Sequence, residues 1–133
     1  MTSDLWYERS VGLKLLGFET NPYDLAKTIP LLSEPHLKGE PLGQRSTYQE
    51  NQIHIVKILG EDDSWGDMLI GLIEDMGGVN ELKTTIQRLN PRNRFIVINK
   101  PISDFSHQLS NDFSCESLKL VSDINCDISF NFF

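Results

Sequence analysis

The sequence has little cysteine and no long apolar run. Only two cysteines, Cys115 and Cys126, occur among the 133 residues. Two thiols cannot build a disulfide framework or fill a four-ligand zinc site, so we expect both to pack as small apolar groups. No stretch approaches the roughly 18–20 apolar residues that a membrane span requires. The first residues are polar and acidic, unlike a secretory signal. We therefore expect a cytoplasmic protein that does not contact a membrane.

Basic residues are absent from one long stretch of the chain. Between Lys57 and Lys83 there is no lysine or arginine, although seven acidic residues lie there. From Lys83 to Lys100 the sign reverses, with five basic residues and no acid. The whole chain carries a net charge of −7. Because binding to phosphates requires clustered basic side chains, this balance argues against a nucleic-acid-binding protein.

Motifs that carry catalysis or hold cofactors are also missing. There is no glycine-rich nucleotide loop, no nucleophile elbow and no pair of histidines at metal-binding spacing. His36, His54 and His107 lie far apart in the sequence, and we expect His54 to be packed in a strand and the other two to lie in loops. Neighbouring carboxylates such as Glu74 and Asp75 point to different sides of a helix. The sequence therefore predicts a protein without catalytic residues, cofactor or metal.

Hydrophobic periodicity indicates alternating strands and helices. Residues 64–77 give the clearest helix, with Ser64 as its cap, one apolar stripe along its length and Gly77 at its end. A further helix with Ser114 as its cap leads to a terminal strand of alternating apolar and polar residues, which we expect inside the sheet. The other expected elements are a strand over 11–18, a helix over 22–29, a strand over 53–59, a helix over 79–89 and a strand over 94–100.

The segment EPHLKGEPLGQR, residues 34–45, fits neither a helix nor a strand pattern. Its prolines and glycines favour a connector between the first helix and the next strand. A short strand over residues 45–49 is expected to form a hairpin with the strand over 53–59. Because the connector mixes charges with turn residues, Lys38 and Glu40 are candidate ligand-binding residues.

These elements predict a single α+β domain spanning residues 1–133. The expected order is strand, helix, one or two strands, two helices, strand, helix, strand. A four- or five-stranded mixed or antiparallel sheet should carry the helices mainly on one face. The first six elements follow the β-α-β-β-α-β order of ferredoxin-like proteins.

The acidic stretch is the main candidate contact surface. An exposed helix with strong negative charge attracts a basic partner and accelerates their encounter. The alternative is that the basic residues of 83–100 fold back and neutralise it. The candidate partner-binding residues are Glu61, Asp62, Asp63, Asp67, Glu74 and Asp75.

Several short motifs resemble a bacterial family catalogued only as domain of unknown function 4279. Lys38-Gly39-Glu40-Pro41 matches the connector of that family, and Asn21-Pro22 to Ile29 resembles its opening helix. Residues 65–89 are similar to its long helical region, and residues 114–132 to its ending. The resemblance spans nearly the whole chain and implies a small α+β protein, in some cases an immunity protein, with no agreed enzymatic role.

Two functional hypotheses follow. The first is a non-enzymatic protein-binding module, most specifically an immunity protein that neutralises a basic toxin domain through its acidic surface. The second is a small-ligand-binding or regulatory domain that uses the 34–45 connector.

Overall fold

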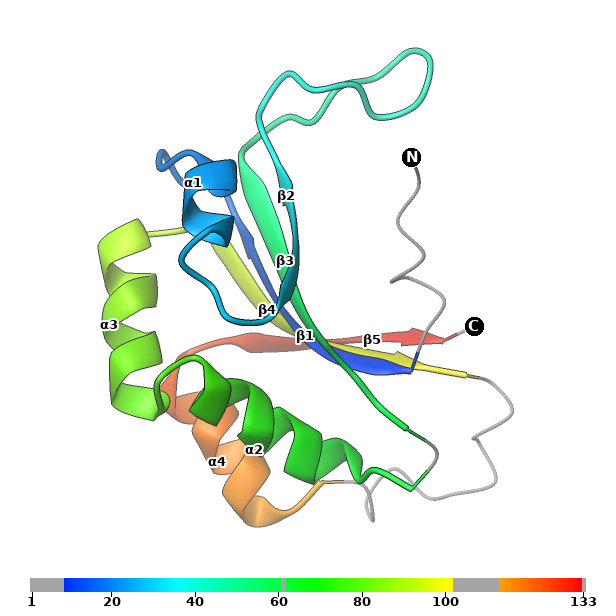
Figure 1. Cartoon of the computed structure of the whole chain (residues 1–133), viewed down its shortest axis with the longest axis vertical. Coiled ribbons are helices and arrows are strands. Elements are labelled where there is room, and N and C mark those ends of the chain that lie inside the picture. The colour runs from blue at the N-terminus through cyan, green and yellow to red at the C-terminus, as the bar shows by residue number, and fades with distance from the viewer. Residues whose placement is uncertain (1–8, 61, 102–112, 133) are drawn as a thin grey trace.

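A computed structural model describes residues 9–60, 62–101 and 113–132, and Figure 1 shows one sheet with helices along one of its faces. The sheet is five-stranded and mixed, in the order β2-β3-β1-β4-β5. All neighbouring strands are antiparallel except β4 and β5, which are parallel. The elements are β1 (Ser10–Leu16), α1 (Pro22–Ala26), β2 (Leu32–His36), β3 (Gln52–Ile58), α2 (Trp65–Asp75), α3 (Val79–Leu89), β4 (Asn93–Lys100), α4 (Cys115–Asp123) and β5 (Asp127–Phe132).

The predicted α+β class and element order are confirmed. β3 lies between β1 and β2 and is antiparallel to both, so β1, α1 and β2 form the split β-α-β unit of the ferredoxin-like order. β5 extends this arrangement by one strand beyond β4.

The central strand β1 directs apolar side chains at alternate positions toward the helices. Val11, Leu13 and Leu15 point to the helix-covered face and are at most 1% exposed. Alternate residues of β3 and β4 join them, among them Ile53, Ile55, Ile96 and Ile98. The side chains of α2, α3 and α4 complete this core, which therefore lies between the sheet and the helices.

Helix ends form where the sequence offers caps. The Asn21 side chain accepts a hydrogen bond from the backbone N–H of Tyr23 at 2.9 Å, and Pro22 occupies the first helical position of α1. Ser64 and Ser114 cap α2 and α4 in the same way. Gly77 and Gly78 adopt positive φ angles of 100° and 93°, which lets α3 begin directly after α2.

Two expectations about strands are wrong. The strand paired with β3 on its outer side is β2, not residues 45–49, which contribute only one isolated bridge between Pro41 and Thr47. The start of the 34–45 connector is thus part of a strand. Pro35 is compatible with this because β2 is an edge strand, where a missing N–H is tolerated.

The terminal strand was expected inside the sheet, but β5 lies at its other edge. Its side chains Ile128, Phe130 and Phe132 do alternate as predicted, yet each remains about 40% exposed. The alternation fixes which residues share a face, whereas the position in the sheet depends on which strands pair. Hydrophobic patterning therefore could not place this strand.

Residues 37–50 leave the sheet as a long loop between β2 and β3 (Figure 1). Backbone hydrogen bonds between Glu40 and Tyr48 and between Leu42 and Ser46 hold its two sides together. Residues 41–47 are all exposed. The loop is therefore a hairpin-like projection from one edge of the sheet.

Candidate functional site

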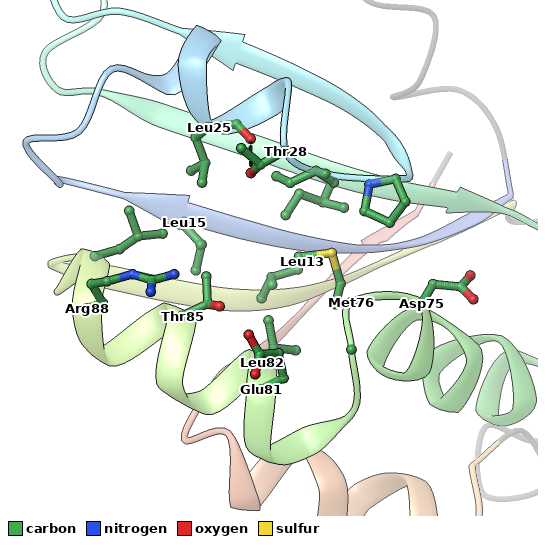
Figure 2. Close-up of a pocket in the computed structure, with 15 residues that line it drawn as sticks. Leu13, Leu15, Leu25, Thr28, Asp75, Met76, Glu81, Leu82, Thr85 and Arg88 are labelled. Carbon is green, nitrogen blue, oxygen red and sulfur yellow. Dashed lines mark hydrogen bonds between the residues drawn. The ribbon is translucent and has the colours of Figure 1, made fainter.

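A groove on the helix side of the sheet lies between α1 and α3 (Figure 2). Its volume is about 400 Å³, within the range of roughly 300–1,000 Å³ typical of ligand pockets. Leu13 and Leu15 of β1 and Ile55 of β3 form the floor. The walls are formed by Leu25, Thr28, Ile29 and Pro30 at α1, and by Asp75, Met76, Gly77, Glu81, Leu82, Thr85, Arg88 and Leu89 at the end of α2 and along α3.

The groove exists because α1 is short. The helix was expected to extend to residue 29, but it ends at Ala26, and residues 27–29 continue as tight turns. Leu25 and Ile29 contact the core while remaining partly exposed. A one-and-a-half-turn helix cannot cover the sheet as far as α3, so apolar side chains line the gap between them.

Polar groups occupy the two ends of the groove. Glu81, Thr85 and Arg88 follow one another on one side of α3, at positions i, i+4 and i+7. Asp75 lines the same end of the groove as Glu81. Its carboxylate forms an ion pair with Lys57 from β3. Within the described residues Arg88 makes no ion pair. The groove therefore has an apolar centre, one unneutralised cation at one end and carboxylates at the other.

The predicted acidic residues lie along α2 and at its start. Asp62, Asp63, Asp67 and Glu74 are exposed, and Glu61 lies outside the described residues. Asp67 and Glu74 are seven residues apart, so they project from the same side of α2 at a distance of about 10 Å along its axis. The opposite side of α2 carries the buried stripe of Trp65, Leu69, Leu72 and Ile73.

Two members of the acidic set have partners inside the molecule. The Asp63 carboxylate accepts a hydrogen bond from the backbone N–H of Gly60 at 2.7 Å, and Asp75 pairs with Lys57. Asp62, Asp67 and Glu74 form no ion pair with another described residue.

The basic residues of 83–100 are spread over several parts of the molecule. Arg92 approaches Glu50 at 3.8 Å, and Lys100 is buried with its ammonium 5.7 Å from the centre of a Trp65 ring. Lys83 and Arg88 lie on α3 and are exposed. Among the described residues, Lys83, Arg88 and Arg92 form no ion pair with the acids of α2.

The connector residues form a separate cluster at the outer edge of the sheet. Glu40 accepts a hydrogen bond from the Tyr23 hydroxyl, which raises the pKa of Tyr23 to about 12 and lowers the pKa of Glu40. His36, expected in a loop, lies in β2 between Glu34 at 2.9 Å and Glu40 at 3.6 Å, and its ring stacks on Tyr48. Lys38 is exposed, and its backbone N–H donates to Asn51. Neither Lys38 nor Glu40 lines the groove.

His54 lies on the sheet face away from the helices and is only 4% exposed, as expected for a packed histidine. Burial, followed by the positive charge of Lys14, lowers the pKa of His54 to about 4. A Cβ atom at Gly12 would lie 2.5 Å from His54 Nε2. Glycine in the middle of β1 therefore provides the room that the imidazole occupies.

The described part of the chain contains no group of metal ligands, and its two cysteines form no disulfide. Its histidine, cysteine and acidic side chains form no group of three able to hold a metal ion. Cys115 and Cys126 are both free; Cys126 packs against the core, whereas Cys115 is exposed rather than packed as expected. No described helix is both long and apolar enough to cross a membrane.

Comparisons with protein families, with curated proteins and with solved structures each returned no match.

Sequence reasoning missed the groove entirely. Its floor residues lie within predicted strands, and Leu82 and Leu89 lie within a predicted helix, but the space between α1 and α3 depends on where α1 ends. One signal was present: Thr28 is followed within two residues by Pro30, which disfavours a helical conformation in the residue before it.

Proposed function

We propose that this chain is a non-enzymatic binding protein that holds a basic protein partner against the exposed side of α2. The observation that carries the proposal is the set of exposed carboxylates of Asp62, Asp67 and Glu74, which have no cationic partner within the described residues. Such charges are fully hydrated and open to an approaching partner, and they accelerate association with a surface of opposite sign.

The most specific form of this proposal is an immunity protein that covers the active site of a toxin. Its support is the local excess of negative charge and the motif resemblance around Lys38-Gly39-Glu40-Pro41. The apolar contacts that would anchor such a complex must come from residues next to α2, because exposed ion pairs alone contribute about 0–1 kcal/mol each. Met68, partly buried on α2, is one adaptable apolar side chain that could do so.

The experiment compares wild-type protein with the triple variant Asp62→Asn, Asp67→Asn, Glu74→Gln. Each tagged protein is used as bait in a lysate of the source organism, and the captured protein is then purified for affinity measurement. We expect a basic protein whose affinity falls at least ten-fold in the triple variant and weakens with added salt.

A matched control removes three exposed acids elsewhere, through Glu116→Gln, Asp123→Asn and Asp127→Asn on α4 and β5. This control should bind as the wild type does. Equal loss in both variants would show a general effect of net charge, and unchanged binding in the α2 variant would refute the acidic contact surface. Circular dichroism is needed for both, because Asp67 lies in the first turn of α2, where its charge stabilises the helix by about 0.3–1 kcal/mol.

A further inference from the structure

The groove between α1 and α3 is independent of the acidic side of α2 and has a chemistry of its own. Its floor and most of its walls are aliphatic, and among the described residues no aromatic side chain lines it. It is open to solvent along the side where Thr28, Pro30 and Arg88 are exposed. Such a surface favours a slender aliphatic ligand over a flat aromatic one, because the apolar walls can enclose a narrow chain.

Arg88 supplies the charged group at one end of this surface. Figure 2 shows its side chain extending from α3 along the groove, with the guanidinium beside Leu15 and Thr85 in that view. The guanidinium makes no ion pair within the described residues, and a planar fork of donors matches a carboxylate. The position of Arg88 in the last turn also favours α3 itself, so a test must separate the two roles.

The opposite end of the groove selects against a second anion. Glu81 lies two helical turns before Arg88, a separation of about 10 Å along α3. Asp75 lies at the same end and is already neutralised by Lys57. A ligand with one anionic head at Arg88 and an uncharged tail would complement this distribution.

We propose that the groove binds an aliphatic carboxylate, with the head paired to Arg88 and the chain lying against the partly exposed side chains of Leu25, Ile29 and Leu89. A volume of about 400 Å³ equals the space of roughly a dozen water molecules at about 30 Å³ each. Decanoate, with ten carbons and two oxygens, has about this size. The chain gains by leaving water, and the head gains a charge-assisted pair at the groove's exposed end.

The test measures binding of decanoate below its micelle concentration by isothermal titration calorimetry, with amide chemical shifts to locate the site. Three probes of the same chain length separate the contributions: decanoate, 1-decanol and decyltrimethylammonium. We expect decanoate to bind at least ten-fold more tightly than the other two, with shifts confined to α1, β1 and α3. Stronger binding of the cation, equal binding of the alcohol, or shifts elsewhere would each overturn the proposal.

Variants on α3 provide the matched comparison. Arg88→Gln should weaken decanoate binding about ten-fold or more while leaving 1-decanol unchanged. Lys83→Gln removes the same charge from the same helix outside the groove and should leave both unchanged. Arg88→Lys keeps the helix-end charge without the planar fork, and we expect an intermediate loss.

A blocking variant tests the chain-binding part separately. Thr85→Trp places a large side chain at the centre of the groove wall, from a half-exposed position, and should abolish binding of decanoate. If Thr85→Trp folds and still binds decanoate as the wild type does, the groove is not the site. If that variant fails to fold, Thr28→Trp, at an exposed position on the opposite wall, should likewise abolish decanoate binding.

Discussion

The two faces of the sheet are buried in different ways, and consecutive residues of β4 show the difference. Ile98 points to the helices and packs in an aliphatic core. Asn99 points to the other face, where it is also fully buried. Its side-chain N–H donates to Ser10 Oγ at 2.9 Å, and its oxygen accepts from Asn131 at 3.1 Å. One face is held by packing, and the other includes directional hydrogen bonds across three strands.

This difference matters because substitutions destabilise the two kinds of interior by different mechanisms. An aliphatic core loses stability in proportion to the volume removed, whereas a buried polar group is costly when its partner disappears. The polar face also contains His54 and Ser10 as buried side chains. The contribution of this face to stability should therefore depend on the protonation of His54.

The largest effect is expected on the helix-covered face. Ile98→Ala removes a side chain that is 1% exposed and should lower the free energy of unfolding by about 2–5 kcal/mol. Urea denaturation measures this loss. Ile128→Ala on β5, where the side chain is 39% exposed, is the matched control and should cost much less. Equal losses would mean that the two positions are packed alike.

The second-largest effect is a loss of stability at low pH, caused by His54 on the sheet face away from the helices. Burial holds the pKa of His54 near 4, below the value of about 6.5 in an unfolded chain. Below pH 6.5 the unfolded chain therefore binds a proton that the folded protein does not, and stability falls as the pH falls toward 4. Between pH 7 and pH 5 the loss due to His54 should be about 2 kcal/mol.

The measurement compares wild type with His54→Gln by urea denaturation at several pH values. The two curves should converge as the pH falls from 7 to 5, because the variant lacks the titrating group while keeping the carboxylates. Parallel curves over that range would show that His54 has an ordinary pKa in the folded protein.

The smallest effect is expected for the hydrogen bonds of Asn99. Asn99→Ala leaves the groups of Ser10 and Asn131 without this partner and should cost about 1–2 kcal/mol. The double variant Ser10→Ala, Asn99→Ala should cost less than the sum of the single changes, because both remove the same interaction. Additive losses in a double-mutant cycle would show that the hydrogen bond contributes nothing to the difference between the faces.

Much of the fold was predictable from local signals. Ser64 and Ser114 were recognised as caps because their side chains act on backbone groups three residues away. The stripe of α2 was recognised because helix periodicity is a local property. The edge position of β5 was not predictable in this way, because it depends on pairing with β4, more than 30 residues earlier in the sequence.

The candidate site was predictable only in part. The excess of acid between Lys57 and Lys83 can be read directly from the sequence, but the pairing of Asp75 with Lys57 requires β3 and α2 to be adjacent. The groove required knowledge of where α1 ends and of its distance from α3. Strand β2 was missed because Pro35 suggests a loop, although an edge strand can accept it.

The central position of β1 also affects how the chain can fold as it is made. β1 pairs on one side with β3 and on the other with β4, so Ser10 faces both Ile58 and Asn99. After residue 58 has been synthesised, 42 more residues are needed to reach Lys100, which takes about 2–8 s at typical rates of translation. During this interval one edge of an apolar strand has no native partner. Nascent chains should therefore remain prone to aggregation through this unpaired edge until β4 leaves the ribosome.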